Sequence, residues 1–296
     1  MGETFIYPDP PTENVVMGSP VDEFDDSARE ACGVVGVYAG GEEAARAVFF
    51  GIYALQHRGQ ESAGIATSDG RSIRAHTEMG LVGQAFQEYD LSRLPGYLSI
   101  GHTRYSTTGS SNISNAQPII SKGTSVEIAL GHNGNVINAL ELREELFDWG
   151  LSFESTADSE IIAHLISNAP ADNWSDRAAY AMRRLQGAYS LVIMTVDKLV
   201  GMRDPLGVRP LCIGRLNGGW VLASESCALD HIGAEYVREV EPGEAVVIDD
   251  DGLKSVYKKS SKGSFGNCVF EQIYFSRPDS ILDGTLVYSS RMAMGA

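Results

Sequence analysis

The sequence lacks several features that would place it in a specialised class. It has no apolar run near the roughly 20 residues needed to cross a bilayer, and no cationic start followed by an apolar stretch, so neither a membrane span nor a secretory signal is expected. Its four cysteines are widely spaced and form no C-x-x-C pair, which argues against a disulfide scaffold or a self-contained zinc site. These absences predict a reduced, cytoplasmic protein.

Basic residues are also scarce, with 23 Lys and Arg against 39 Asp and Glu and a formal net charge of −16. Such a surface repels phosphate polyanions, so neither nucleic acid nor an anionic membrane is expected as a partner. Hydrophobic residues make up 43% and charged residues 21% of the 296 residues. These proportions are typical of a globular protein that can bury a substantial core.

Residues 1–31 differ from the rest of the chain. They hold eight acidic residues, one base and four of the eleven prolines. No helical or strand period is visible there, so we expect a disordered leader or propeptide. The composition changes at Cys32, where strand and helix patterns begin, and we expect one large domain over 32–262. Residues 263–296 are expected to begin the connection to a further domain, because the chain ends as SSRMAMGA starts to look helical.

The predicted elements follow the order strands, helices, strands. A buried strand (CGVVGVY) comes first, a hairpin is predicted around Asp69-Gly70, and YLSIGHTRYSTTG and VEIALGHNGNVIN predict strands that run into polar loops. Helices are expected near 42–59, 136–148, 158–168 and 176–186. Strand patterns resume after Gly187. This order is not a regular βα alternation, so we predict an α+β fold of mostly antiparallel sheets with helices packed on them.

Cys32 has two interpretations. It could be a small buried apolar residue at the start of a strand. Alternatively, removal of the leader between Ala31 and Cys32 would place a free α-amino group beside the thiol. The reference pKa of an α-amino group is about 7.7–8.0, so it can accept the thiol proton near neutral pH and activate a nucleophile without a catalytic histidine.

Three polar segments offer further candidate residues, each with a structural alternative. GHTRYSTTG could be a simple turn, or Arg104 with Thr107 could clamp a carboxylate. GHNGN could be a hairpin or a helix cap, or Asn133 and Gly134 could form an oxyanion hole. TADSE could cap a helix, or Asp158 could bind the ammonium group of an amino acid.

Taken together, CGVVGVY, LQHRGQESAGIA, GHTRYSTTG, GHNGNVIN and DSE resemble, in order and spacing, the glutaminase domain of class II N-terminal-nucleophile (Ntn) glutamine amidotransferases. RDPLGVRPLCIGRL, ASESCALD and CVFEQIYFSRPDS are most similar to the branch of that family that carries a phosphoribosyltransferase domain and begins purine synthesis. The resemblance covers residues from Cys32 to about 290. It implies a four-layer αββα sandwich and autoproteolytic removal of the leader.

The resemblance also implies roles for individual residues. Cys32 would be the nucleophile that forms a thioester with glutamine, and the oxyanion hole would come from Asn133 and Gly134. The substrate-binding residues would be Arg58 and Gly59, which shape the pocket, Arg104 and Thr107 at the α-carboxylate, and Asp158 at the α-amino group. Ammonia would pass to the second domain and react there with phosphoribosyl pyrophosphate in the presence of Mg²⁺.

Cys268 is a separate case. Its pattern alone suggests a buried thiol at a strand start, whereas the resemblance implies the first of four ligands of a [4Fe–4S] cluster in the complete enzyme, with the other three in the second half. Cys212 and Cys227 are expected in the core. The complete enzyme is expected to be a homo-oligomer. The alternatives are the glutaminase half of a glucosamine-phosphate or asparagine synthetase, and a catalytically silent domain that keeps the fold.

Overall fold

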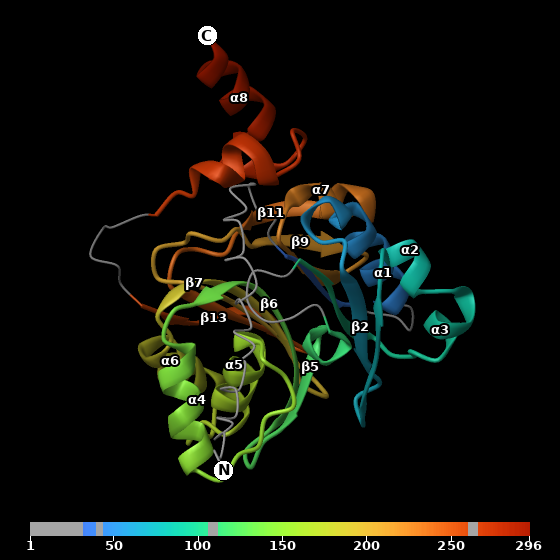
Figure 1. Cartoon of the computed structure of the whole chain (residues 1–296). Coiled ribbons are helices and arrows are strands. Elements are labelled where there is room, and N and C mark those ends of the chain that lie inside the picture. Colours follow the sequence, from blue (N-terminus) through green and yellow to red (C-terminus); the bar gives the residue numbers. More distant parts are fainter. Residues whose placement is uncertain (1–31, 40–43, 106–111, 260–265) are drawn as a thin grey trace, which may run out of the picture.

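The computed structural model describes residues 32–39, 44–105, 112–259 and 266–296. The expected leader and Thr107 lie outside these ranges. Two antiparallel sheets form the centre of the molecule (Figure 1). The first has seven strands in the order β11-β9-β10-β1-β4-β2-β3. Their bounds are β1 Gly33–Tyr38, β2 Ser62–Ser68, β3 Ile73–Met79, β4 Leu98–Arg104, β9 Cys212–Leu216, β10 Gly219–Ala223 and β11 Glu235–Glu239.

The second sheet has six strands in the order β13-β12-β8-β7-β6-β5. Their bounds are β5 Ile119–Lys122, β6 Glu127–Val136, β7 Gly187–Met194, β8 Leu199–Arg203, β12 Glu244–Asp249 and β13 Gly252–Lys258. The two sheets pack face to face through fully buried side chains of both, among them Val34, Ile100, Val192 and Leu222. This contact holds β1 and β4 of one sheet against β6 and β7 of the other.

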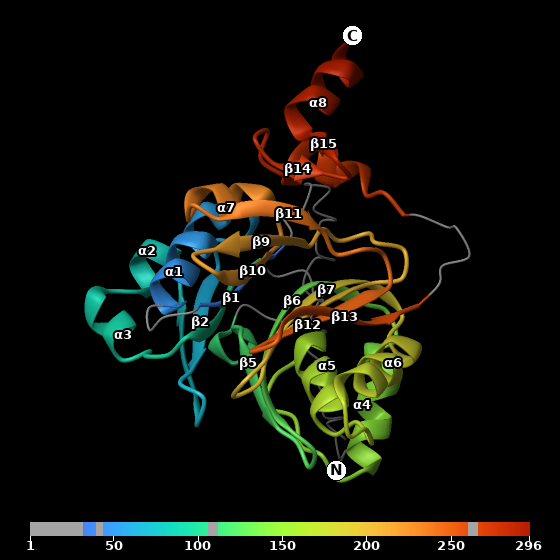
Figure 2. The ribbon, with the colours of Figure 1, turned by 180° about the vertical axis from the view of Figure 1, so that it is seen from behind.

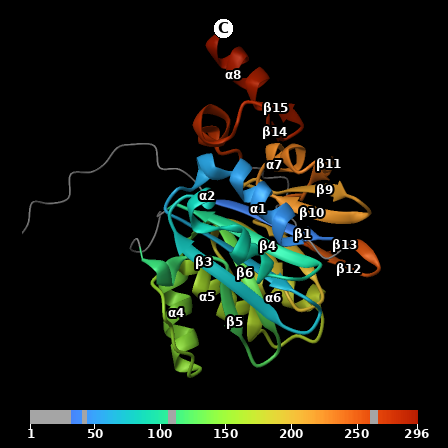
Figure 3. The ribbon, with the colours of Figure 1, turned by 90° about the vertical axis from the view of Figure 1, so that its right-hand side faces the viewer.

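Helices cover the outer face of each sheet (Figure 3). The first sheet packs against α1 and α7 with the short α2, and the second packs against α4, α5 and α6. The bounds are α1 Ala44–Ala54, α2 Val82–Ala85, α3 Glu88–Ser92, α4 Ala139–Asp148, α5 Asp158–Ser167, α6 Trp174–Arg184 and α7 Ser226–His231, with short 3₁₀ turns η1 Gln56–Arg58 and η2 Ile113–Asn115. The order of layers is therefore αββα, which confirms the predicted fold class.

The predicted elements agree with the structure except at a few places. The predicted helix over 42–59 is divided into α1 and η1, and β2 and β3 form the hairpin around Asp69-Gly70. There, Asp69 Oδ1 accepts hydrogen bonds from the N–H groups of Arg71 and Ser72, both at 3.0 Å, and Gly70 has a φ of +83°. The sequence patterns missed β5, β11, α7, α2 and α3.

The C-terminal residues 266–296 lie beyond the end of the first sheet, and α8 projects away from both sheets (Figure 2). This segment contains a π turn, a two-strand hairpin and the predicted final helix, with bounds η3 Glu271–Phe275, β14 Ile281–Leu282, β15 Thr285–Leu286 and α8 Val287–Gly295. Its first part packs on the core, whereas α8 carries mostly exposed side chains. Within the described ranges, no helix combines the length and the apolar character that a membrane span requires.

Candidate active site

Cys32 directly precedes β1 and is buried, with 8% of its surface exposed. Its Sγ donates a hydrogen bond to the main-chain oxygen of Tyr105 over 3.6 Å. Burial raises the pKa of the Cys32 thiol, and the positive charge of Arg104 offsets this only in part. The resting group is therefore a neutral thiol, and nucleophilic chemistry at this position requires a base that takes its proton.

Arg104 ends β4, beside the start of β1. Because the two strands are antiparallel and Gly33 pairs with Thr103, Arg104 lies next to the position of Cys32. The Arg104 side chain is almost fully buried, and its Nη1 donates to Glu61 Oε1 at 2.7 Å. A ligand carboxylate bound here would share the guanidinium with Glu61.

Asn133 and Gly134 lie within β6, so the prediction of a polar loop at GHNGN is wrong. The Asn-Gly pair is a local turn signal, but β6 continues because its residues pair with β7 as far as Val136. Gly134 has a φ of +149°, and a Cβ there would lie 2.1 Å from the main-chain oxygen of Ala188, so only glycine fits.

The Asn133 side chain is fully buried, yet neither its Oδ1 nor its Nδ2 has a hydrogen-bond partner among the described residues. Buried side-chain amides are nearly always hydrogen-bonded, so a buried amide without a partner needs an explanation. A ligand atom that accepts a hydrogen bond from Nδ2 would supply one.

Asp158 is the first residue of α5, and the residue in the N-cap position is Ala157. The Asp158 carboxylate accepts a hydrogen bond from the N–H of Val136 at 3.0 Å and lies 3.5 Å from Nδ1 of His132. Burial opposes its ionisation, but His132 and the Val136 N–H outweigh burial and lower the pKa of Asp158. The alternative in which Asp158 caps the helix is therefore wrong, and the carboxylate is an anion directed at β6.

Two buried histidines lie behind these residues. His102 Nε2 is 2.9 Å from the main-chain oxygen of His132 and links the two sheets. Burial lowers the pKa of His102 to about 3, so the ring is neutral and Nε2–H donates. Gln117 accepts from the N–H of His132 at 2.8 Å and donates to Ser159 Oγ at 2.9 Å. Sequence reasoning missed this supporting set, although both histidines stand in the motifs that it singled out.

Arg58 lies in η1 and is fully buried. Its Nε donates to the main-chain oxygen of Cys32 at 3.1 Å, and its terminal nitrogens bind Glu225 and Glu271. The guanidinium thus contacts the main chain of Cys32 and two carboxylates. A Cβ on Gly59 would lie 2.6 Å from the main-chain carbon of Thr103, so glycine allows this loop to lie against β4.

The candidate residues come together from four elements. Across the two sheets, a Cβ on Gly131 of β6 would lie 3.4 Å from Val34 Cγ1 of β1. The charges of Arg104 and Asp158 both act on the Cys32 thiol. One buried region therefore contains a thiol (Cys32), a side-chain amide without a hydrogen-bond partner among the described residues (Asn133), a cation (Arg104) and an anion (Asp158). Such a site suits a zwitterionic ligand that undergoes acyl transfer.

The other cysteines are placed differently. Cys212 and Cys227 are buried in the core, as predicted. Cys268 is partly exposed and lies just before the helical turn that contains η3, so the prediction of a strand start is wrong. No group of three or more His, Cys, Asp or Glu residues that could hold a metal occurs in the described part of the chain. Cys268 is therefore a single candidate ligand, and a cluster would need thiolates from elsewhere.

Comparisons with known proteins agree with this geometry. A glutamine amidotransferase domain model matches residues 102–231. The chain is 50% identical over 280 residues to amidophosphoribosyltransferase of Synechococcus elongatus, covering 92% of this chain and 56% of the relative. It is 43% identical over 291 residues to that of Mycobacterium bovis, covering 96% and 55% respectively. The chain thus spans little more than half the length of these curated relatives.

Two solved structures are also similar. One is described as the allosteric regulatory enzyme of purine biosynthesis, with 42% identity, a TM-score of 0.82, and coverage of 89% of this chain and 57% of the other. The second is glutamine phosphoribosylpyrophosphate amidotransferase from B. subtilis in complex with ADP and GMP, with 41% identity, a TM-score of 0.81 and the same coverage. The fold is that of a class II glutamine amidotransferase domain. Within this class, the chain is similar over most of its length to amidophosphoribosyltransferases.

Proposed function

We propose that this chain is the glutaminase part of an amidophosphoribosyltransferase and hydrolyses L-glutamine to glutamate and ammonia through a thioester on Cys32. The observation that carries the proposal is the buried Asn133 amide, which has no partner among the described residues although it lies in the same buried region as the Cys32 thiol. An unsatisfied amide beside a nucleophile costs stability, and stabilising an oxyanion gives a reason to retain it.

Glutamine binds through its two charged ends. The α-carboxylate pairs with Arg104, with help from the Thr107 hydroxyl, and the α-amino group pairs with the anionic Asp158. Gly59 shapes the pocket beside Cys32. This arrangement fixes the side-chain amide of glutamine next to the Cys32 thiol.

Removal of residues 1–31 makes the amine of Cys32 the general base. The amine takes the thiol proton as sulfur attacks the amide carbon, and the C–S bond forms while the carbonyl oxygen becomes an oxyanion held by the Asn133 amide and the Gly134 N–H. The C–N bond then breaks, and the ammonium returns the proton to the leaving nitrogen, which departs as ammonia. Water adds to the thioester, releases glutamate and restores the thiol.

Because burial raises the pKa of the Cys32 thiol, a free thiolate is a minor species at neutral pH. Proton transfer is therefore coupled to the attack on the amide. This predicts that activity follows the protonation of the α-amino group rather than that of an independent thiolate.

The remaining steps belong to the second half that the relatives' length implies. There, ammonia would displace pyrophosphate from phosphoribosyl pyrophosphate and give 5-phosphoribosylamine, and Mg²⁺ bound in that half would offset the pyrophosphate charge. This is the first committed step of purine synthesis. Cys268, the partly exposed cysteine of the described residues, would supply one thiolate if the complete protein holds a structural [4Fe–4S] cluster. The complete protein is expected to be a cytoplasmic homo-oligomer.

The test is intact-mass analysis of the purified protein before and after a glutamine-mimicking diazoketone is added, together with a glutamate-release assay. A mass that begins at Cys32, one added label at that residue and steady glutamate release are expected. Full-length protein that still turns over glutamine would refute the amine as base. An intact leader with neither labelling nor turnover would favour a catalytically silent domain.

A further inference from the structure

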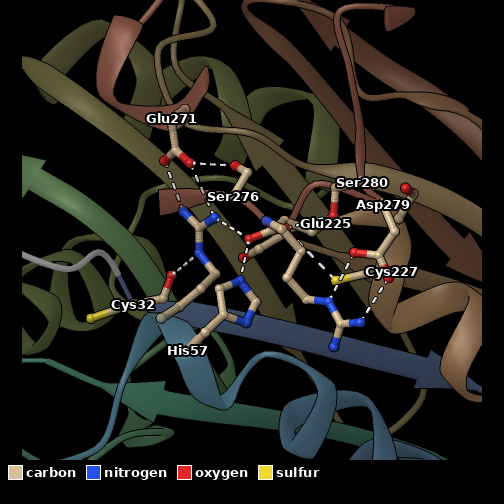
Figure 4. A network of polar contacts seen from close by, with 12 residues as sticks. Cys32, His57, Glu225, Cys227, Glu271, Ser276, Asp279 and Ser280 are labelled. Carbon is tan, nitrogen blue, oxygen red and sulfur yellow. Dashed lines mark hydrogen bonds and ion pairs between the residues drawn. The ribbon is translucent and has the colours of Figure 1, made fainter. Parts of the chain in front are cut away.

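Two carboxylates, those of Glu271 in the C-terminal segment and Glu225 in the core, lie close together near Cys32 and His57 (Figure 4). Both bind Arg58. Glu271, from η3, binds Arg58 through both oxygens, with Oε1 2.7 Å from Nη2 and Oε2 3.1 Å from Nη1. It also accepts hydrogen bonds from Arg209 Nη1 at 3.1 Å and Ser276 Oγ at 3.0 Å. One carboxylate thus joins the segment to two arginines of the core.

Glu225, at the start of α7, makes the reciprocal contacts from the core. Its Oε1 binds His57 at 2.9 Å and Arg58 Nη1 at 2.5 Å. Its Oε2 accepts from the N–H of Arg277 at 2.9 Å and from Ser280 Oγ at 2.6 Å. The segment is therefore anchored at Glu271 and again at residues 277–280.

The three charges at the centre of this network are shielded from water. The side chains of Arg58 and Glu225 have no exposed surface, and that of Glu271 is 4% exposed. Buried charges are tolerated only when paired and hydrogen-bonded, and loss of one partner leaves the other uncompensated. The position of Arg58 therefore depends on both carboxylates.

Arg58 links the two carboxylates to Cys32, the candidate nucleophile. Its Nε donates to the main-chain oxygen of Cys32 at 3.1 Å, on the same planar group whose two Nη atoms are held by Glu271. Because a guanidinium is rigid, a shift at the Nη atoms shifts Nε as well. Cys32 lies just before β1, whose pairing with β4 begins at Gly33, and the bond from Arg58 holds its main-chain oxygen to the core.

We propose that Glu271 and Arg58 are positioning residues of the glutaminase reaction, and that the C-terminal segment completes the active site by holding the main chain of Cys32. The inference rests on the proposed function and deepens it. Residues beyond the expected domain boundary at 262 then belong functionally to the glutaminase.

The test compares Glu271→Gln with Arg277→Ala in the complete protein. Glu271→Gln keeps the shape of the side chain and removes its charge. Arg277→Ala removes an exposed ion pair with Asp279 in the same segment and leaves the buried network intact, because only the main chain of Arg277 contacts Glu225. The readouts are kcat and KM for glutamine, the rate of diazoketone labelling of Cys32, and the melting temperature.

Glu271→Gln is expected to lower kcat and the labelling rate about 10–100-fold, the effect typical of a misplaced reactive group, while KM for glutamine changes less than about two-fold. Arg277→Ala should leave both rates unchanged. Adding Arg58→Lys to Glu271→Gln should lower kcat by much less than the product of the two single effects, because both act through one network.

A purely structural network would lower the melting temperature of Glu271→Gln but leave kcat unchanged at temperatures well below melting, and that result would overturn the inference. If Glu271→Gln does not fold, Ser276→Ala removes a single hydrogen bond to Glu271, and a kcat within experimental error of wild type would refute the idea equally. A wild-type protein that neither hydrolyses glutamine nor labels would instead overturn the proposed function as well.

Discussion

Replacement of Asn133 by alanine is expected to separate activity from stability. The Asn133 amide is fully buried, and its two polar atoms lack partners among the described residues. A buried unsatisfied polar group costs about 1–3 kcal/mol. Removing the amide relieves that cost, whereas the small cavity that remains lowers the free energy of unfolding and offsets part of the stabilisation. We expect stability to stay level or rise by about 1 kcal/mol, which corresponds to about 2–4 °C in melting temperature.

Activity is expected to change in the opposite direction. Loss of one oxyanion-hole donor typically lowers kcat about 10²–10³-fold. Steady-state glutamate release and thermal denaturation of the same preparation measure the two effects side by side. Asn115→Ala is the matched control, because Asn115 is also fully buried but its amide is satisfied, accepting from the Thr156 N–H at 3.0 Å and donating to Thr156 Oγ1 at 3.1 Å. That variant should lose about 1–3 kcal/mol of stability.

Two results would refute this reasoning. If Asn133→Ala were destabilised as strongly as Asn115→Ala, the Asn133 amide would have to be satisfied in the resting protein and its role would be structural. If kcat fell by less than about ten-fold, Asn133 would not be the donor that stabilises the oxyanion. Either outcome would remove the observation on which the proposed function rests.

The proposed chemistry and the buried charges predict three further results. Cys32→Ser should abolish steady-state glutamate release, because an alkoxide is harder to generate than a thiolate, and turnover near the wild-type rate would contradict the nucleophile assignment. Asp158→Asn should raise KM for glutamine at least ten-fold with little change in melting temperature, because the amide oxygen still accepts from the Val136 N–H while the charge is lost, and the reverse pattern would indicate a structural role. Burial opposes ionisation of Glu225, but Arg58 and His57 outweigh it and lower its pKa from 4.5 to about 2. The resulting stability, about 3 kcal/mol, is present above pH 4.5 and is lost as pH falls toward 2, a dependence that urea titrations should find reduced in Glu225→Gln.

Local patterns predicted the elements whose signals are strong and short in range. The hairpin at Asp69-Gly70, the helices near 158–168 and 176–186 and the buried first strand all appear close to their expected positions. Their signals are a turn dipeptide, a 3.6-residue apolar period and a β-branched run, each read within a dozen residues. The alternation of strands and helices then limited the fold to a layered α+β arrangement.

The GHNGN segment shows where a local sequence pattern predicts the wrong secondary structure. An Asn-Gly pair between polar residues predicts a turn, but hydrogen bonding to β7 keeps residues 131–136 extended. Gly134 serves a close approach to Ala188 rather than a reversal of the chain. The partner strand begins more than 50 residues later in the sequence, so the local pattern carries no information about it.

The burial and pairing of these charged residues could not be predicted from the sequence for the same reason. Arg58 is separated from Glu225 by 167 residues and from Glu271 by 213. In the sequence, each of these looks like an ordinary surface residue, and charged residues are seldom fully buried. Only the fold reveals that the three meet without water, and that Arg58 is bonded to the main chain of Cys32.

This arrangement also changes what the composition boundary near 262 means. The change in composition marks where the sheet sandwich ends, but the proposed active site extends beyond it, because Glu271 and residues 277–280 make buried contacts with the core. Replacing a buried ion pair by apolar residues often costs no stability, so stability alone is a weak reason to bury these charges here. The proposed role supplies a stronger reason, since a network that ends on Cys32, the proposed nucleophile, would make its geometry depend on the segment that leads out of the sandwich.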